Sequence, residues 1–394
     1  MNKETKVIVL GADHHNTLAV IRCLGQQKVP FELVVTSSKR KEDIKVGKSR
    51  YSLKYTVVQE NEEDIISTLL DLKNPEEKKA IIPCTDFTAL VIDLNASALL
   101  DYYILPGFQE NYGKVAFLMD KYNQKLLADE YGIPMAKSWK CGLINGHFTL
   151  PSDLVCPCII KPLVSAYGCK NDIIIANHEE EVNNALVEFE SKKYKEIIIQ
   201  EFLIKEFECC AYGCIVQNRN KYYGGIVRKL REFPPNGGGS LTYAKFIQDK
   251  RINELLKKIQ DMLWKEKYSG LYDIELLVCK NGIYLNEINF RHSGNGYALI
   301  KNGIPAPYIW YIAAVGKETC SFPRTVNKET FHMDEINEVT HLKANNVSIF
   351  KFLWSVLHTK AFSVFSFKDI PGTFAFYYPF LLRAKRKCLH IFRR

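Results

Sequence analysis

Short apolar runs and amphipathic segments alternate through the first part of the chain. Residues 6–13 (KVIVLGAD) form an apolar run that ends at a glycine turn, which is typical of a buried strand. Residues 16–27 have the spacing of a helix with Asn16 as a candidate cap, and residues 31–38 form a second apolar run. A strand, a helix and a strand in this order predict a doubly wound α/β sheet. We expect this Rossmann-like domain to span residues 1–106.

The pattern changes after residue 112, where predicted strands become more frequent. An amphipathic helix is predicted over residues 114–133, and later apolar runs predict a strand ending in IIKP, a strand reading IIIQEFL and several longer strands. The glycine-rich segment 234–240 is predicted to be a flexible loop. This mixture indicates an α+β region. We divide the rest of the chain into a small subdomain, a larger one, and an aromatic and basic tail: 107–190, 191–316 and 317–394.

Two apolar runs within residues 270–291 flank the tripeptide KNG, which is a hairpin signal. We expect residues 280–282 to form a three-residue loop, with Gly282 in the left-handed conformation. Glu275 then faces Glu287 on the neighbouring strand, because successive side chains alternate between the faces of a sheet. A two-residue turn would shift the register by one position and separate the two glutamates.

In the three-residue register, one face of the hairpin is polar and the other is apolar. The polar face carries Asp273, Glu275, Leu277, Leu285, Glu287, Asn289 and Arg291. The core face carries Tyr272, Ile274, Leu276, Val278, Tyr284, Ile288 and Phe290. Opposed carboxylates about 5 Å apart destabilise a strand pair, and a divalent cation would remove the repulsion. Carboxylate and amide oxygens suit Mg²⁺, which also takes nucleotide phosphates as ligands, whereas an exposed polar strand face is the alternative.

Composition and charge narrow the classes of function. The chain has 47% hydrophobic residues, as expected of a globular protein, and its formal net charge of +9 fits anionic substrates or an acidic membrane surface. No nucleic-acid recognition motif is found, so we expect no nucleic-acid partner. The 12 cysteines include no C-x-x-C pair, which argues against zinc and favours a reduced, cytoplasmic protein. No apolar run is long enough to predict a transmembrane helix.

The turn after the first predicted strand reads GADHHN and does not match the dinucleotide motif G-x-G-x-x-G. His14 and His15 stand where a pyrophosphate would need close approach of the backbone. These histidines are candidates to hold a small carboxylate at a helix N-terminus, and solvent-facing loop histidines are the alternative.

The motifs after residue 112 are most informative in their order and spacing. E-x11-E-x-N-x-R on the predicted hairpin, preceded by the IIKP strand and a QEFL segment, resembles the ATP-grasp superfamily over residues 112–316. The resemblance implies an N-terminal Rossmann-like pre-ATP-grasp domain followed by a two-subdomain ATP-grasp fold. Within the superfamily, the layout is most similar to predicted carboxylate–amine ligases, including D-aspartate ligase-like proteins.

The resemblance implies a metal site on the hairpin. By match to the family motif, Glu275, Glu287 and Asn289 hold one or two Mg²⁺ ions, for which Mn²⁺ is a substitute. Arg291 is the catalytic arginine that faces the transferring phosphate. Asp273 has no fixed family role, and we expect it to support the ligands or the hairpin.

The resemblance also implies an ATP site. Lys121 and Lys161 match the two lysines that bind ATP phosphates, and Ser165 and Gly168 match the loop that closes over them, although the family has more glycines there. The adenine and ribose contacts follow from the hinge and the later strands. The resemblance assigns the adenine edge to the carbonyl of Glu201 and the amide of Leu203. It assigns the ribose hydroxyls to Glu208, with Glu206 as the rival. Leu277 is expected under the adenine, and the alternative is that it is an ordinary core leucine.

The implied reaction joins a small-molecule carboxylate to an amine. ATP phosphorylates the carboxylate, and the amine attacks the acyl phosphate to leave an amide. Arg228 is a candidate catalytic cation, with a solvated basic strand as the alternative. The substrate pocket is expected to include a backbone nest at Ser293 and Gly294, together with His14 and Gly238.

Two other classes of function stay open: a nucleotide-binding, membrane-associated module without turnover, and a small-molecule kinase. Residues 374–382 are largely aromatic and precede a cluster of arginines and lysines without acids. Such a tail suits peripheral contact with the inner face of an anionic membrane, whereas packing on the enzyme is the alternative. The sequence identifies neither the acid, nor the amine, nor the oligomeric state.

Overall fold

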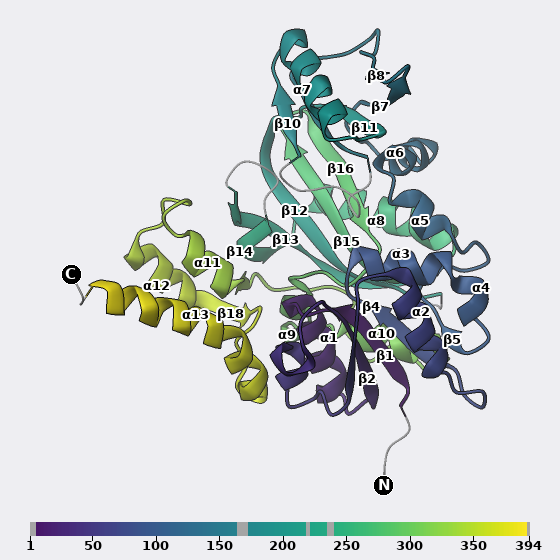
Figure 1. Cartoon of the computed structure of the whole chain (residues 1–394), viewed down its shortest axis with the longest axis vertical. Coiled ribbons are helices and arrows are strands. Elements are labelled where there is room, and N and C mark those ends of the chain that lie inside the picture. Colours follow the sequence, from purple (N-terminus) through teal and green to yellow (C-terminus); the bar gives the residue numbers. More distant parts are fainter. Residues whose placement is uncertain (1–4, 164–171, 218–220, 235–239, 392–394) are drawn as a thin grey trace.

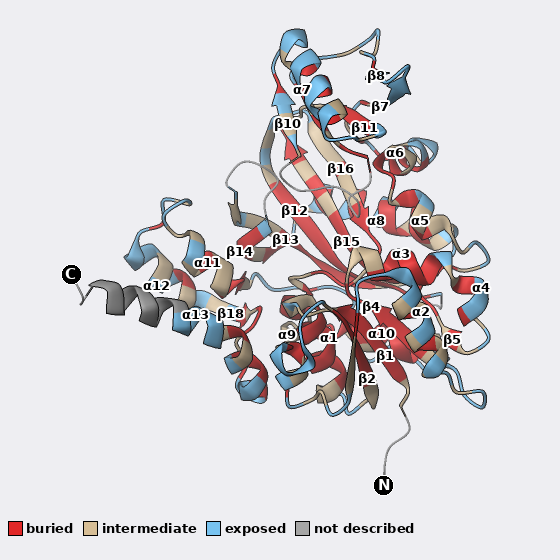
Figure 2. Cartoon of the chain, viewed as in Figure 1, coloured by how far each residue is buried: buried red, intermediate tan, exposed pale blue. Residues whose placement is uncertain are grey.

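The structure is a computed structural model that describes residues 5–163, 172–217, 221–234 and 240–391. Its elements form three sheets, and the long strands of the third sheet extend from the N-terminal domain toward the second sheet (Figure 1). No helix in these ranges is long and apolar enough to cross a membrane. Buried residues concentrate where the sheets meet their helices (Figure 2).

The first sheet is parallel, with strand order β3-β2-β1-β4-β5, and confirms the predicted doubly wound domain. Its strands are β1 (Val7–Ala12), β2 (Phe31–Thr36), β3 (Tyr55–Val58), β4 (Lys79–Pro83) and β5 (Tyr103–Ile104). Its helices are α1 (His15–Gln26), α2 (Glu62–Asp71), α3 (Asp86–Leu94) and α4 (Ala96–Leu99), with short 3-10 turns at Lys41–Asp43 and Val46–Lys48.

The start of α1 differs from the prediction by one residue. Helix α1 begins at His15, and the imidazole of His14 caps it by accepting from the backbone N–H of Asn16 at 3.4 Å. Asn16 therefore lies inside the first turn and does not cap it; its side-chain amide instead donates to the carbonyl of Cys84 at 3.4 Å.

The second sheet has the order β10-β9-β11-β7-β8 and is antiparallel. Its strands are β7 (Ser138–Ile144), β8 (His147–Phe148), β9 (Cys158–Pro162), β10 (Ile174–Ala176) and β11 (Glu196–Glu201). The helices in this part of the chain are α5 (Lys114–Leu118), α6 (Lys121–Glu130) and α7 (Glu179–Ser191).

The single helix predicted over residues 114–133 is broken in two. Asp120 leaves the helical conformation and caps α6, since its carboxylate accepts from the backbone N–H groups of Tyr122 at 2.7 Å and Asn123 at 3.2 Å. An aspartate satisfies a helix N-terminus better than a helix interior, which explains the break. The cap places Lys121 at the first position of α6.

The third sheet has the order β16-β15-β12-β13-β14-β17-β18, with β6 pairing onto β15. Its strands are β6 (Gly107–Phe108), β12 (Lys205–Ile215), β13 (Tyr222–Phe233), β14 (Ser240–Ile247), β15 (Tyr268–Cys279), β16 (Gly282–Asn289), β17 (Phe331–Met333) and β18 (Thr359–Phe362). The accompanying helices are α8 (Lys250–Lys265), α9 (Gly296–Lys301), α10 (Ala306–Ala314), α11 (Glu335–His341), α12 (Ile349–His358) and α13 (Ile370–Ile391).

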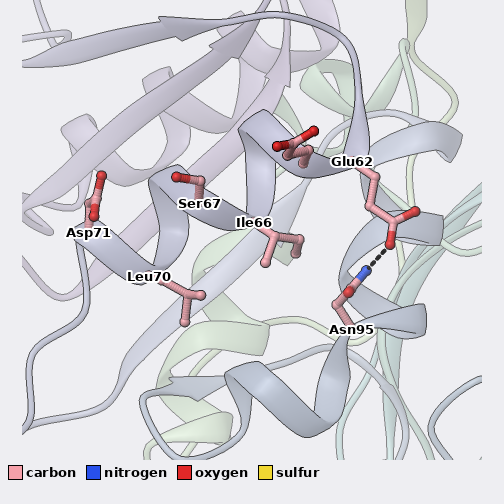
Figure 3. A pocket seen from close by; sticks show the side chains of 7 residues that line it. Glu62, Ile66, Ser67, Leu70, Asp71 and Asn95 are labelled. Atoms are coloured by element: carbon pink, nitrogen blue, oxygen red, sulfur yellow. Dashed lines mark hydrogen bonds between the residues drawn. The ribbon is translucent and has the colours of Figure 1, made fainter.

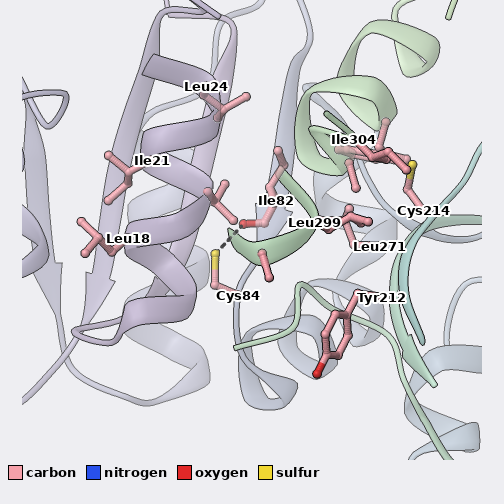
Figure 4. Close-up of a cluster of buried hydrophobic side chains, with 14 of the residues drawn as sticks. Leu18, Ile21, Leu24, Ile82, Cys84, Tyr212, Cys214, Leu271, Leu299 and Ile304 are labelled. Carbon is pink, nitrogen blue, oxygen red and sulfur yellow. Dashed lines mark hydrogen bonds between the residues drawn. The ribbon is translucent and has the colours of Figure 1, made fainter. Parts of the chain in front are cut away.

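One apolar core joins the N-terminal domain to the third sheet. Leu18 and Ile21 of α1, Cys84, Tyr212 of β12 and Leu271 of β15 belong to this cluster, and Figure 4 labels them. This shared core holds the carboxyl ends of β1 and β4 next to the hairpin formed by β15 and β16. Ligands of open α/β sheets bind at such carboxyl ends.

The C-terminal segment is fixed to the N-terminal domain by a buried ion pair. Arg22 of α1 donates through Nε to Asp369 at 2.8 Å, and both side chains are fully buried. Asp369 also accepts from the Ser49 hydroxyl and the Arg50 backbone N–H, each at 2.9 Å. The residues predicted as a tail thus pack on the rest of the chain, and they also add β17 and β18 to the third sheet.

Candidate active site

The β15–β16 hairpin has a two-residue turn, so the predicted three-residue loop is wrong. Cys279 pairs with Gly282, and Gly282 is not in the left-handed conformation. The register then shifts by one residue at a bulge in β16, between the pairs Leu276–Leu285 and Glu275–Glu287. The bulge compensates for the shorter turn, and Glu275 and Glu287 face each other as predicted.

The bulge also corrects the assignment of side chains near the turn. Leu285 is paired with Leu276 and lies in the apolar core, whereas the prediction placed it on the polar face. Tyr284 is paired with Leu277, on the other face, whereas the prediction placed it in the core. Beyond the bulge, Asp273 pairs with Asn289 as predicted.

The polar face of the hairpin concentrates negative charge. Burial raises the pKa of Glu275, and Asp273 and Glu287 add to the rise although Lys229 opposes it. One carboxylate oxygen of Asp273 is buried without a hydrogen-bond partner among the described residues. The described residues hold no group of three or more His, Cys, Asp or Glu side chains placed for a metal ion. Glu275, Glu287 and Asn289 offer two carboxylates and an amide, which fits a Mg²⁺ ion that takes its remaining ligands from phosphates and water.

Helix α6 brings Lys121 to this face. Gln124 of α6 pairs with the backbone of Ile288, donating to its carbonyl at 2.9 Å and accepting from its N–H at 2.8 Å. This pair holds α6 against β16, and it leaves the Lys121 ammonium 3.8 Å from a carboxylate oxygen of Glu287. The two side chains are far apart in sequence and were predicted as parts of one site.

Lys161 of β9 reaches the same group of charges. Burial lowers the pKa of Lys161 to about 8, and Lys121 contributes to the decrease while Glu287 and Glu275 oppose it. Two lysines therefore lie close enough to repel each other beside two carboxylates that also repel each other. Such an arrangement would be stabilised by a polyanion on the lysines and a cation on the carboxylates.

The predicted ribose ligand Glu208 is buried on the site face, cross-strand from Leu277. Its carboxylate is paired with Lys205 and Lys229. Burial acts to raise the pKa of Glu208, but the two lysines outweigh it and hold the pKa below its ordinary value. The rival, Glu206, is exposed.

The segment that the resemblance assigns to the hinge follows β11. Glu201 is the last residue of β11, and its N–H donates to the carbonyl of Lys137 at 2.8 Å. Phe202 similarly donates to Pro157 at 2.9 Å, and Leu203 follows in the connection to β12. Three predicted residues, Ser165, Gly168 and Gly238, lie outside the residues that the structure describes.

Arg228 does not lie on the face that carries the carboxylates. Its cross-strand partner is Cys209, and its guanidinium lies over the ring of Phe207 at 4.0 Å. Because side chains alternate along β13, the cation on the site face is its neighbour Lys229. Burial opposes the charge of Lys229, but Cys210, Glu275 and Glu208 outweigh this effect and raise its pKa. Because neighbouring residues of a strand lie on opposite faces, the sequence already indicated that Arg228 and Lys229 are on different faces of the sheet.

Arg291 links the hairpin to the N-terminal domain. Its Nη1 donates to Asp273 at 2.9 Å, and its Nε lies 3.1 Å from a carboxylate oxygen of Asp86. Burial opposes the charge of Arg291, but Asp86 and Asp273 outweigh it and raise the pKa. Asp86 begins α3, directly beyond the carboxyl end of β4, so the guanidinium is held between the two domains.

The segment after Arg291 packs closely against the first turn of the N-terminal domain. A Cβ atom added to Gly294 would come within 2.8 Å of the Asn16 side chain and 3.2 Å of the His15 ring. Burial, with Lys45 nearby, lowers the pKa of His15 to about 4, so its imidazole is neutral at pH 7. Gly294, which follows Ser293, therefore lies beside His15, and the His14 ring lies next to that of His15 with 3.9 Å between the ring centroids, but His15 supplies no positive charge for a carboxylate.

Two residues at this turn were not predicted. The buried Asp334 carboxylate lies 3.9 Å from the His15 ring, and a ring nitrogen of buried His292 has no hydrogen-bond partner among the described residues. Asp334 belongs to the segment predicted as a tail, and only its tertiary contacts reveal it. His292 follows Arg291 directly, and its position on the polar segment was the signal available in the sequence.

A separate hollow lies on the outer face of the first domain, with a volume of about 630 Å³. Figure 3 shows Ile66, Leu70 and Asp71 of α2 along it, and a hydrogen bond of 2.9 Å from Asn95 to Glu62 at one end. It contains none of the predicted site residues.

The sequence matches no known protein-family model and no curated protein. Similar solved structures include an N5-carboxyaminoimidazole synthetase from Staphylococcus aureus, with a TM-score of 0.64 and 15% identity over 87% of this chain and 86% of that chain. Another is the L-amino acid ligase from Bacillus licheniformis, with a TM-score of 0.61 and 13% identity over 81% and 76%. A third is the biotin carboxylase from Campylobacter jejuni, with a TM-score of 0.62 and 15% identity over 83% and 75%. The chain therefore has the ATP-grasp fold, preceded by a parallel α/β domain, that these proteins share.

Proposed function

We propose that this chain is an ATP-dependent carboxylate–amine ligase that forms an amide through an acyl phosphate. The main support is the convergence of Lys121 and Lys161 on Glu275 and Glu287, since these residues come from separate elements and have matching charges for a metal–nucleotide complex. Solved structures with this fold include complexes of N5-carboxyaminoimidazole ribonucleotide synthetases with ADP and with ATP.

Each predicted group has a distinct part in the proposed reaction. Lys121 and Lys161 bind the phosphates and offset their charge, and Arg291, held by Asp86 and Asp273, stabilises the phosphoryl group in transit. Glu275, Glu287 and Asn289 would hold Mg²⁺, which supplies Lewis-acid stabilisation of the phosphate oxygens. These residues act by orientation and electrostatics, which suits phosphoryl transfer.

The proposed acceptor site lies between the first turn and the segment after Arg291. Ser293 and Gly294 belong to that segment, and His14 and His15 belong to the first turn, where burial lowers their pKa values to about 3 and about 4 and keeps both rings neutral at pH 7. The carboxylate substrate would lie next to the Arg291 guanidinium, which Asp86 and Asp273 hold beside this segment. The amine would then attack the acyl phosphate from the same crevice.

The test is a substrate screen with Mg²⁺ and ATP. Pools of amino acids, hydroxy acids and amines are incubated with the full chain, and ADP and phosphate are measured. A ligase releases both with an amide in the product mass spectrum, whereas a kinase releases ADP with a phosphorylated product. Absence of ADP release with every acid–amine pair would contradict the proposal.

The shifted pKa of Lys161 predicts a pH dependence of ATP binding. The pKa of about 8 means that free Lys161 loses its charge as the pH rises through this value, although an ordinary lysine stays charged. The dissociation constant of Mg–ATP, measured by calorimetry from pH 6.5 to 9.5, should therefore increase above about pH 8. In Lys161→Arg the guanidinium stays charged, and the increase should disappear. An identical rise in both proteins would assign it to another group.

The alternation of side chains along β13 predicts unequal effects of two neighbouring substitutions. Lys229→Met should reduce kcat/KM about tenfold or more, because it removes a charge that compensates Glu208 and Glu275. Arg228→Met removes a cation from the opposite face and should change kcat/KM less than about threefold. Steady-state ADP release measures both, and circular dichroism establishes that both variants fold. A larger effect at Arg228 would restore the original assignment.

A further inference from the structure

The C-terminal part of the chain presents an unusual surface charge. Residues 339–394 contain ten lysines and arginines but a single acid, Asp369. Asp369 is fully buried and paired with Arg22, so it contributes no charge to the surface. Lys343, Lys351 and Lys368 are exposed, and no acid is exposed among the described side chains of this segment.

Helix α12 faces its apolar side outward. Phe350 and Leu357 are 81% and 83% exposed, and Ile349, Leu353 and Trp354 are at least half exposed. Residues 349, 353 and 357 follow one another at intervals of four, and so do residues 350 and 354. The two rows are adjacent, so together they form one stripe on the helix. The buried side chain of α12 is the polar Ser355, which accepts a hydrogen bond from Arg231 at 2.9 Å. A globular helix shows the opposite arrangement.

Helix α13 also exposes apolar residues, although its Phe376 is buried in the core. Ile370, Phe374, Tyr378 and Leu382 are spaced at intervals of four residues, and all are exposed. Phe367, just before the helix, is also an exposed apolar residue, with 81% of its surface accessible. Both helices lie beside β18 at the edge of the third sheet (Figure 1), and Figure 2 shows exposed positions along α12 and the first half of α13.

We propose that α12 and the first half of α13 form a docking surface for an anionic lipid bilayer. Exposed apolar residues in one contiguous stripe indicate an interaction site, and exposed lysines without acids complement lipid headgroups. Exposed Phe, Trp and Tyr side chains beside lysines are typical of helices that lie in the membrane interface. The sequence predicted membrane contact through the tail that begins at residue 374. The proposed surface is larger, because α12 lies before residue 374 and provides the exposed Phe350 and Leu357.

The surface is tested by flotation of the full chain with lipid vesicles. Phosphatidylcholine vesicles with about one-third phosphatidylglycerol are compared with pure phosphatidylcholine vesicles, at low and at high salt. We expect flotation with the anionic vesicles alone, and weaker flotation at high salt. Trp354 fluorescence, isolated in a variant that replaces the other tryptophans by phenylalanine, should shift to shorter wavelength on binding.

Matched variants assign the binding to α12. Phe350→Gln/Leu357→Gln should weaken binding to the anionic vesicles about tenfold or more. The control Leu53→Gln/Val187→Gln changes two exposed apolar residues elsewhere, which are 93% and 63% exposed, and should bind like the unaltered chain. ADP release should be unchanged in both. Absence of binding to anionic vesicles, equal binding by both variants, or a dimer in sedimentation that Phe350→Gln/Leu357→Gln dissociates without any lipid binding would each overturn the proposal.

Discussion

Replacing Glu287 by glutamine is expected to reduce ADP release about a thousandfold or more. Glutamine keeps the shape of the side chain but removes the charge that faces Glu275 and lies 3.8 Å from Lys121. Lewis-acid stabilisation by a bound metal is worth several kcal/mol, and each 1.36 kcal/mol changes a rate tenfold. Steady-state ADP release with saturating Mg²⁺ and ATP, in the presence of the substrates found by the screen, measures the loss.

The control for this substitution is Glu254→Gln, an exposed glutamate on α8 that should retain the activity of the unaltered chain. The dissociation constant of ATP adds a second readout. In Glu287→Gln the difference in affinity between ATP with Mg²⁺ and ATP with excess chelator should become small. Activity within tenfold of the unaltered chain would show that Glu287 is not a metal ligand.

Replacing Arg22 by methionine is expected to destabilise the chain by about 3–5 kcal/mol, because it leaves the buried Asp369 carboxylate without its cation. The midpoint of thermal unfolding should fall by about 4–6 °C, because the unfolding entropy of a chain of 394 residues is large. Asp369 keeps its hydrogen bonds from Ser49 and from the backbone of Arg50, so the lower end of the range is the expected value. Differential scanning calorimetry and urea unfolding measure the change.

Two further variants distinguish the loss of the buried Arg22–Asp369 ion pair from the general effect of replacing an arginine. Arg40→Met removes an exposed arginine that pairs with Glu42 and Asp43, and it should change the stability by less than about 1 kcal/mol. Arg22→Met/Asp369→Asn removes both charges of the buried pair and should recover part of the stability lost in Arg22→Met. A loss below 1 kcal/mol in Arg22→Met would show that the C-terminal segment does not depend on this contact.

The hairpin shows how far sequence patterns can specify a site. The alternation around Glu275 and the spacing to Glu287 were sufficient to place the two carboxylates opposite each other. The turn length and the bulge were both missed, because one residue more in a strand compensates for one residue less in the turn. Only Leu285 and Tyr284, which lie near the turn, were assigned to the wrong face of the sheet.

Sites made from distant elements were predicted through family resemblance and not through geometry. Lys121 and Lys161 come from a helix start and a strand end, and no periodicity indicates that they meet Glu287. The structure explains the meeting by local contacts, since Asp120 breaks the helix and Gln124 fixes it to β16. The domain boundaries at residues 106, 190 and 316 stay predictions.

The residues after 316 were the least predictable. Their composition indicated a tail, but β17 and β18 complete a sheet edge and Asp369 enters the core. An isolated acid in a basic segment was a signal that was available in the sequence, since a lone acid among cations is a candidate for a specific pair. The position of Asp334 beside His15 depends on this packing and could not be derived without it.

Because of the bulge at Asn286, the length of the turn does not by itself decide on which face of the sheet Glu287 lies. Side chains between the bulge and the turn follow one phase of alternation, and those on the far side of the bulge follow the opposite phase. A redesigned hairpin could therefore take a three-residue turn in exchange for Asn286 and keep Glu275 opposite Glu287. Deletion of Asn286 would remove the bulge, join Leu285 directly to Glu287 and leave Glu287 opposite Glu275. Loss of the bulge with Asn286 kept would instead place Asn286 opposite Glu275 and turn Glu287 and Asn289 toward the core, so the site depends on the bulge and not only on the residues that form it.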